Sequence, residues 1–465
     1  MTVGWDDRVV LARPPRKVQV DPPVNNSVAT IPATMVAPAP AATSRWRAGY
    51  TMALICTISV INIGDRSLLS VLMQPMKVEM HFSDSVLGSL GFLFAIAYST
   101  SAFPIARVAD RADRIRLLAL CLSIWSVFTA ATGLARGLTQ LILVRIGVAC
   151  AESGAYPAAQ SLIADLFARR WRATMLSVYA ASAPVGGALG LALGALVASV
   201  YGWRAAFVII GLPGLVLALL VWLTAFEPRR FRAQGHTRPP SVVPLRNFLP
   251  TLYKDPQVRL ALLIAVSVAF TGGGVGGWSA PFFMRIHHMS LRAVGSWLGA
   301  ATLVGGVCGG LLSGFVSDRL AARDLRWYPR VAALGVLLGL PASILYLTIP
   351  ESGTAIAWML VERFTSSFWL GPIFALILTV VEPGVRALLA ATLTTLITVS
   401  GGLGGLCVGL LSDRLYPFAG DLALRGAMLA AVAPAAVAGV CCLLLIRIVP
   451  RSLPLVPPPS RAGSG

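Results

Sequence analysis

The sequence predicts an all-α membrane protein with twelve transmembrane helices in two pseudo-symmetric bundles of six. Three observations support this fold class. Of the 465 residues, 56% are hydrophobic and 12% are charged, which leaves too few polar side chains to cover a soluble protein of this length. The apolar residues gather in long runs, and segments of the first half of the chain recur in the second half.

Twelve apolar runs are long enough to cross a bilayer, because about 20 helical residues span the roughly 30 Å of hydrocarbon. The runs cover residues 48–74, 86–107, 116–135, 138–160, 172–199, 204–225, 258–284, 294–316, 329–349, 354–380, 387–411 and 422–448. The longest polar interruption lies between the sixth and seventh runs and divides them into six and six.

Domain boundaries follow from these runs. Residues 1–45 are rich in Pro, Ala and Val without a long apolar core, so we expect a disordered cytoplasmic N-terminal tail. We then expect an N-terminal six-helix bundle at 46–226 and a cytoplasmic linker at 227–257. A C-terminal six-helix bundle at 258–449 and a cytoplasmic C-terminal tail at 450–465 complete the chain.

The distribution of positive charge predicts the orientation in the membrane. With both termini in the cytoplasm, 28 of the 38 Lys and Arg residues lie on the cytoplasmic side and 7 on the other side. The formal net charge of +19 is therefore a topology signal and a match to anionic lipid head groups. We expect a multi-pass protein of the inner (plasma) membrane that contacts membrane lipids and binds no nucleic acid.

An internal repeat links the two bundles. "ADR" at 109–111 recurs as "SDR" at 317–319, and "RRWRATMLSVYAASAPVGG" at 169–187 has its counterpart in "GVRALLAATLTTLITVSGG" at 384–402. Transporters that are built from such repeats place their substrate between the halves, near the midplane of the bilayer.

A small group of ionisable residues stands inside the apolar runs. An ionised group at the bilayer centre costs about 2.5–3.5 kcal/mol on insertion scales, so it persists where it has a partner or lines a wet cavity. We predict that Asp65, Arg66, Arg145, Glu152 and Glu362 line a cavity for proton coupling and substrate.

Helix geometry suggests how these charges pair. Arg145 and Glu152 are seven residues apart, about 10 Å along one helix face, so their partners come from another helix or from the substrate. We expect Asp65 to face Arg145 and Arg66 to meet Glu152. Two alternatives stay open: a structural ion-pair network that only fixes the first helix to the fourth, and a late start of the tenth helix that leaves Glu362 near the outer interface.

Glycine and proline mark two further segments. Pro184, Gly186 and Gly187 in the fifth run allow close helix approach and bending. Gly273 and Gly274 lie in "TGGGVGGWSAP", which is the second-half counterpart of the charged segment in the first run. This glycine density predicts a broken or rocking helix, with tight packing against a neighbour as the alternative.

Several motifs together resemble the major facilitator superfamily. They are "VADRADRIR" at 108–116, its echo "SDRL", "LVRIGVACAESG" and "SAPVGGALG", and the resemblance covers all twelve runs. "IGDRSLLS", "RIGVACAESGAYPAAQSLIADLF" and "RRWRATMLSVYA" are similar to the spinster-like branch, mainly in the first half. Ala106 and Ile115 depart from the loop motif of the superfamily.

The resemblance implies a cytoplasmic gate and a function. The gate contact stabilises an outward-open state, with simple topology and lipid contact as the alternative reading of its residues. The gate residues are Asp110, Arg111, Arg114, Asp318 and Arg319. The spinster-like branch implies that the charged residues of the first and fourth helices link proton state to amphiphile binding.

We therefore predict a secondary active transporter that works by alternating access and is proton-coupled. Its substrate would be an amphipathic or anionic organic molecule, lysolipid-like by resemblance. An organic-anion (sugar acid or aromatic acid):proton symporter of the same superfamily is the alternative, and a non-transporting membrane receptor or scaffold is an alternative of another class. We expect a small-molecule substrate and H+ as partners, and a monomer.

Other chemistry has no signature in the sequence. There is no GxxxxGK[ST] phosphate loop, no metal-spaced set of His and Cys, and no nucleophile–base constellation. We therefore predict a protein that is not an enzyme and has neither a cofactor nor a metal site.

Overall fold

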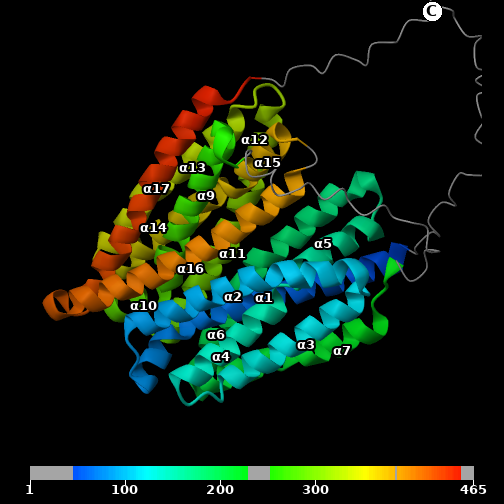
Figure 1. Cartoon of the computed structure of the whole chain (residues 1–465). Helices are drawn as coiled ribbons and strands as arrows, with labels where there is room; N and C mark the ends of the chain where they lie inside the picture. The colour runs from blue at the N-terminus through cyan, green and yellow to red at the C-terminus, as the bar shows by residue number, and fades with distance from the viewer. Residues whose placement is uncertain (1–44, 229–251, 383–384, 452–465) are drawn as a thin grey trace, which may run out of the picture. The chain divides into compact units, whose positions relative to one another are not determined.

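The computed structural model describes residues 45–228, 252–382 and 385–451. The predicted N-terminal tail, most of the predicted linker and nearly all of the predicted C-terminal tail lie outside these ranges. The described chain is almost entirely helical (Figure 1).

The helices fall into two sets that are separated by residues 229–251. The N-terminal set contains α1 (Arg45–Met80), α2 (Asp84–Arg111), α3 (Arg114–Thr132), α4 (Leu138–Glu152), α5 (Ala155–Leu166), α6 (Arg169–Gly211) and α7 (Pro213–Thr224). The C-terminal set contains α9 (Pro256–Thr271), η3 (Gly272–Gly276), α10 (Gly277–Ile286), α11 (Leu291–Val304), η4 (Gly305–Gly309), α12 (Gly310–Ala321), α13 (Trp327–Thr348), α14 (Ser352–Thr365), η5 (Ser366–Phe368), α15 (Leu370–Val380), α16 (Arg386–Ala419) and α17 (Leu422–Ile448). Here η3 and η4 are π-helical, and η5 is a 3₁₀ turn.

The number of membrane crossings agrees with the sequence. Eleven stretches of the described chain are long and apolar enough to cross a membrane. One of them, Arg170–Thr224, has 55 residues and is interrupted at Gly202, whose φ of 82° is not helical. Because this stretch supplies two crossings, the prediction of twelve transmembrane helices is confirmed.

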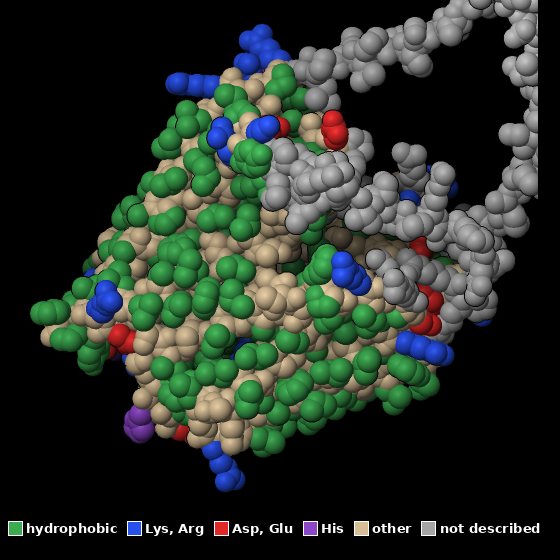
Figure 2. Space-filling model, in the orientation of Figure 1, with side chains coloured by type: hydrophobic (Ala, Val, Ile, Leu, Met, Phe, Trp, Pro, Cys, Tyr) green, Lys and Arg blue, Asp and Glu red, His purple; other side chains and the backbone are tan. Residues whose placement is uncertain are grey.

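The outer faces of the helices are apolar, as a bilayer requires. In Figure 2, hydrophobic side chains cover most of the visible face and the charged side chains lie mainly toward its margins. Large exposed apolar residues such as Leu193, Val216 and Leu311 belong to these faces. Side chains of this kind face lipid at little cost, because lipid tails are as apolar as leucine.

Glycine contacts bring the helices of the N-terminal set close together. α1 packs along α6. A methyl group on Gly190 of α6 would lie 2.7 Å from the Cα atom of Gly64 on α1, and one on Gly186 would lie 2.9 Å from the Cα atom of Val60. Pro184 of α6 lies against the C-terminal set. A methyl group on Gly306 would lie 2.8 Å from the Cβ atom of Pro184.

The glycine-rich segment at 272–276 is continuous π-helix rather than a broken helix. Such a π-helical turn is an insertion into an α-helix and often marks a functional site. A methyl group on Gly273 would lie 2.7 Å from the Cα atom of Gly401 on α16, and one on Gly274 would lie 2.9 Å from Ala431 on α17. The helix is therefore continuous through this segment and packs tightly against α16 and α17, while bending or rocking at Gly273 and Gly274 stays a prediction.

The two sets are joined most closely at one side of the bundle. We call it the Met80 side, where α1 ends and α2 begins, and we call the opposite side the Arg45 side. Across the sets, α2 packs along α16 and α6 packs along α11. A methyl group on Gly88 of α2 would lie 2.7 Å from the carbonyl oxygen of Gly405 on α16.

Candidate functional site

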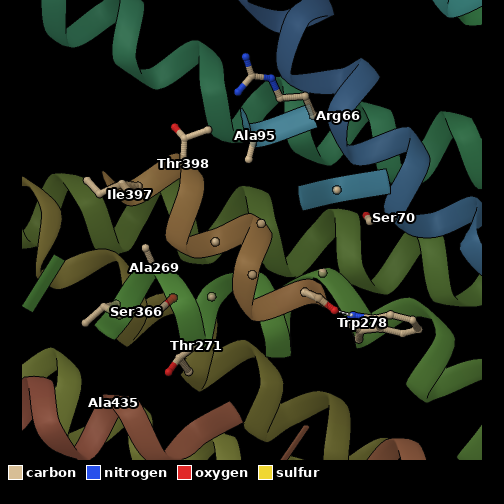
Figure 3. Close-up of a pocket in the computed structure, with 18 of the residues that line it drawn as sticks. Arg66, Ser70, Ala95, Ala269, Thr271, Trp278, Ser366, Ile397, Thr398 and Ala435 are labelled. Atoms are coloured by element: carbon tan, nitrogen blue, oxygen red, sulfur yellow. Dashed lines mark hydrogen bonds between the residues drawn. The ribbon is translucent and has the colours of Figure 1, made fainter. Parts of the chain in front are cut away.

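A cavity of about 560 Å³ lies between the two sets. Figure 3 shows Arg66 and Ala95 of the N-terminal set together with Thr271 and Ala435 of the C-terminal set around this main cavity. Its charged lining residues are Arg66, Arg145, Glu362 and Arg363. Its larger apolar lining residues are Leu69, Met73, Phe94, Val268, Trp278, Val336, Leu340, Trp369 and Ile397. The main cavity is therefore largely apolar, with cations contributed by both sets.

The predicted contact between Arg66 and Glu152 is present. The Nε atom of Arg66 lies 2.7 Å from Oε2 of Glu152, the last residue of α4, where a break of two residues separates α4 from α5. The Arg66 guanidinium also lies over two rings of α2, 5.1 Å from the centre of Phe94 and 4.5 Å from that of Tyr98. Arg66 is thus satisfied on several sides, by one carboxylate and two aromatic faces.

Arg145 lies in the same region without an ion-pair partner among the described residues. Only 3% of the residue is exposed, and its Nε and Nη1 atoms have no hydrogen-bond partner among the described residues. Its guanidinium lies 5.1 Å from the centre of the Phe94 ring. Buried donors without acceptors are costly and rare in proteins, so this side chain is suited to receive an acceptor from a ligand.

Asp65 differs from the sequence expectation. It does not pair with Arg145; instead Oδ2 of the fully buried carboxyl accepts a hydrogen bond of 3.2 Å from Thr129 on α3, and Oδ1 has no partner. Adjacent helical residues point about 100° apart, so Asp65 turns toward α3 while Arg66 reaches α4. The expected contact between Asp65 and Arg145 is therefore wrong in this conformation.

A smaller side cavity of about 200 Å³ adjoins the ion pair. Arg66 lines both cavities, and Glu152 lines only the smaller one. Asn62 also lines the side cavity near Glu152. Neither its Nδ2 atom nor Oε1 of Glu152 lies within good hydrogen-bond geometry of a described partner in this conformation. The pair of Arg66 and Glu152 therefore stands between the two cavities, and its carboxylate has one position open to water or a proton.

Glu362 lies inside the bundle rather than near an interface. α14 begins at Ser352, which places Glu362 about 15 Å along the helix axis, and both Glu362 and Arg363 line the main cavity. The alternative of a late helix start is therefore wrong. The two side chains form a loose ion pair of 3.6 Å.

The predicted gate residues are not brought together by any contact between described side chains. Asp110 and Arg111 end α2, and their side chains lie outside the described part of the structure. Asp318 accepts a hydrogen bond of 3.3 Å from Tyr328 within the C-terminal set, and Arg319 lies over the ring of Phe315.

Arg114 is fully buried inside the N-terminal set. Its Nη2 atom lies 2.5 Å from Oε1 of Glu227, and its Nη1 atom lies 2.8 Å from Oδ2 of Asp165. These contacts tie the start of α3 to α5 and to the segment after α7. In this conformation Arg114 therefore holds one set together.

The strongest polar link between the sets was not anticipated from the sequence. Asp84, 1% exposed at the start of α2, accepts hydrogen bonds of 2.7 Å from Lys77, from both terminal nitrogens of Arg285 and from Ser412. Lys77 belongs to α1, Arg285 to α10 and Ser412 to α16, so one carboxylate links α2 to three other helices, two of them in the other set.

A second carboxylate completes this link. Asp413 of α16 accepts hydrogen bonds from the backbone N–H groups of Asp84, at 2.9 Å, and Ser85, at 2.7 Å. It thereby caps α2 from the other set, where the helix dipole favours negative charge. We call Lys77, Asp84, Arg285, Ser412 and Asp413 the Asp84 network. All hydrogen bonds and ion pairs between described residues of the two sets lie here or in the adjoining contact of Arg285 with Gln74.

The described residues contain no group of three His, Cys, Asp or Glu side chains that could hold a metal ion. The site therefore consists of an apolar cavity between two helix sets, buried charges on its walls, and an ionic link that closes one side.

Comparison with known proteins identifies the family. Residues 55–406 match the model of the Major Facilitator Superfamily. The chain belongs to this superfamily. It is 33% identical over 397 residues to an MFS-type efflux pump of Mycolicibacterium smegmatis, covering 85% of this chain and 92% of the relative.

Further matches place this transporter in the spinster-like branch. It is 28% identical over 390 residues to spinster homolog 1 of Homo sapiens, covering 79% of this chain and 74% of the relative. It also resembles the crystal structure of a bacterial homolog of the human lysosomal transporter Spinster in an inward-facing, unoccupied conformation. That likeness has a TM-score of 0.77 and 27% identity, and it covers 87% of this chain and 98% of the other. Because the relatives are transporters, the expectation that the chain is not an enzyme is confirmed.

Proposed function

We propose that this transporter moves an anionic amphipathic molecule by alternating access and couples the movement to protons. The single observation that carries the proposal is Arg145: a buried guanidinium with two free donors on the wall of a largely apolar cavity. Such a wall suits a molecule with an acidic group and an apolar body. A sugar acid has no apolar body to pack against the apolar lining of the cavity. The organic-anion symporter is therefore the second candidate function.

The orientation proposed here follows from the positive charges. The sequence segments expected in the cytoplasm hold 28 of the 38 Lys and Arg residues, so the Arg45 side would face the cytoplasm, with both termini there. The Asp84 network would then close the outer side, as in an inward-facing state. Asp110, Arg111, Asp318 and Arg319 would meet only when the cytoplasmic side closes. The transporter would work as a monomer in the inner membrane.

Proton coupling would use the two buried acids. Asp65 and Glu152 each keep one carboxyl oxygen without a hydrogen-bond partner, so each has a free position for a proton. Glu152 is bound to Arg66, and protonation would weaken that ion pair and change the charge beside the cavity. Substrate binding at Arg145 and proton binding at Glu152 would then influence each other through the shared local charge.

Binding is tested by ligands that differ only in charge. The purified protein is heated with 1-oleoyl lysophosphatidate or with monooleoylglycerol, which lacks the phosphate. We expect the lysophosphatidate to raise the unfolding temperature more, because a ligand that binds the folded state stabilises it. Arg145→Gln should remove the difference, and Arg292→Gln, at an exposed position, should keep it. Equal stabilisation by both ligands would contradict the anion site.

Coupling is tested in proteoliposomes with an imposed pH gradient. Asp65→Asn and Glu152→Gln should reduce the gradient-driven transport of lysophosphatidate, while Asp421→Asn, at an exposed position, should not. Undiminished gradient-driven transport in both Asp65→Asn and Glu152→Gln would exclude the coupling role of these acids. A receptor or scaffold would bind the ligand and show no response to the gradient.

A further inference from the structure

Arg363 is a second cation on the wall of the main cavity, and it comes from the C-terminal set. Its Nη2 atom donates weakly to the carbonyl oxygen of Gly276, at 3.4 Å, and to Oγ of Ser279, at 3.2 Å. Its Nε atom is buried without a hydrogen-bond partner, and the nearest carboxylate, that of Glu362, is 3.6 Å away. The guanidinium is therefore held in place while much of its capacity to donate hydrogen bonds stays unused.

The backbone around Arg363 leaves room for this side chain. A methyl group on Gly276 of η3 would lie 2.9 Å from Nη1 of Arg363, and one on Gly305 of η4 would lie 2.8 Å from its Cβ atom. Both glycines belong to the π-helical segments of the C-terminal set. Two irregular turns thus form a cradle that admits the arginine, which a side chain at either glycine would crowd.

The two incompletely satisfied arginines belong to opposite sets and line the same cavity. Arg145 comes from α4 and Arg363 from α14. The rest of the lining is largely apolar, with Leu69 from the N-terminal set and Val336 and Leu340 from the C-terminal set. A molecule with one acidic group would bind one of the two arginines and leave the other as it stands, which for Arg363 means only the loose ion pair with Glu362.

We propose that Arg363 is a second anion-binding residue and that the substrate is a dianion, with an acidic group at each end of an apolar body. One acid would bind Arg145 and the other Arg363, so the molecule would bridge the two helix sets. This inference rests on the proposed function, because it takes the main cavity as the substrate site. The competing explanation is that Arg363 only neutralises Glu362.

The test compares α,ω-dicarboxylates of eight to sixteen carbons with monocarboxylates of the same lengths, by calorimetry on the purified protein. Partition into detergent is the same for every variant, so the comparison is made between variants. We expect Arg363→Gln to weaken the best dicarboxylate about tenfold or more, the loss that corresponds to one hydrogen bond between charged groups. Monocarboxylate binding should change less than threefold. Arg145→Gln should weaken both ligands, and Arg292→Gln should change neither.

A second variant controls for a loss of binding that is caused by misfolding. The double change Glu362→Gln with Arg363→Gln removes both charges of the pair and leaves no buried carboxylate without its cation. If Arg363 served only to neutralise Glu362, this variant would bind dicarboxylates as the wild type does, and the proposal would be overturned. We expect it instead to bind them as weakly as the single variant, while Arg363→Lys recovers part of the affinity.

The outcomes separate this inference from the proposed function. If monocarboxylates bind through Arg145 and dicarboxylates are insensitive to Arg363, the bridging substrate is refuted and the anion transporter stands. If no carboxylate in the series binds the wild-type protein, the bridging substrate is refuted, and the lysophosphatidate test decides the proposed function. If carboxylates bind and their binding does not depend on Arg145, both proposals are refuted.

Discussion

Replacing Asp84 by asparagine should open the Met80 side of the bundle. The change keeps the size of the side chain and removes its charge. The four donors that converge on the carboxylate, one from Lys77, two from Arg285 and one from Ser412, would then face an amide that can satisfy fewer of them. The amide nitrogen is itself a hydrogen-bond donor, so it would face other donors without an acceptor.

The size of the effect follows from burial. Asp84 is 1% exposed, and the side chain of Arg285 is 8% exposed. Removing one partner of a buried ion pair costs about 3–5 kcal/mol, because the other charge is left buried without compensation. When the Met80 side opens, these groups enter water, so the loss applies to the closed state. A change of 3 kcal/mol shifts an equilibrium about a hundredfold.

Hydrogen–deuterium exchange measures this shift in equilibrium without a probe attached to the protein. We expect faster exchange in Asp84→Asn at the end of α1, at the start of α2 and at the end of α10, by up to about a hundredfold. Amides that exchange through local opening report its free energy directly. Peptides from the Arg45 side, such as those of α5, should exchange no faster than in the wild type, because that side closes when the Met80 side opens.

A nearby ion pair supplies the control. Glu79 pairs with Arg204 inside the N-terminal set, and its side chain is 52% exposed. Exposed pairs contribute about 0–1 kcal/mol, so Glu79→Gln should change exchange less than fivefold. If Asp84→Asn accelerates exchange no more than Glu79→Gln does, the Asp84 network is not what closes this side.

Three further predictions concern stability. Gly190→Leu should lower the free energy of unfolding by about 1–3 kcal/mol or more, seen in thermal unfolding, because the backbone of Gly64 cannot move aside. Arg114→Gln should cost about 3–5 kcal/mol, with faster hydrogen exchange confined to the N-terminal set, because Glu227 loses a buried partner. Burial and the charge of Arg425 lower the pKa of His287, which lies between two spans. Below about pH 6.5 the imidazole is protonated in the unfolded chain but stays neutral in the folded chain, so acid favours unfolding. His287→Gln should therefore reduce the loss of thermal stability between pH 7.5 and pH 5.5.

The sequence predicts the helices well because each membrane span must satisfy its own backbone. A run of about 20 apolar residues has few alternatives to a helix in lipid, so the spans can be located without knowing their neighbours. Buried charges are equally visible, because Arg66 and Glu152 stand out against apolar runs. Their pairing was predictable from their depths, whereas the turn of Asp65 toward Thr129 depends on where α3 lies.

The Asp84 network was not predictable, because its charges do not stand out in the sequence. Its charged members lie at the ends of helices, where lysine, arginine and aspartate are expected from topology alone. The partners of Asp84 in the other set are also far away in the chain, with Arg285 201 residues and Ser412 328 residues later. Only the packing of α2 along α16 brings them together, and hydropathy carries no information about that contact.

The two proposed anion contacts give alternating access a thermodynamic reason. A ligand shifts a conformational equilibrium only if it binds one state better than the other. A molecule held by Arg145 alone would move with the N-terminal set and make the same contacts in both conformations. A molecule that also reaches Arg363 loses a contact whenever the sets separate around the cavity. It would therefore favour closure of the Arg45 side, while the Asp84 network favours closure of the Met80 side. The balance between these two ionic contacts would set which side is open when the substrate is bound.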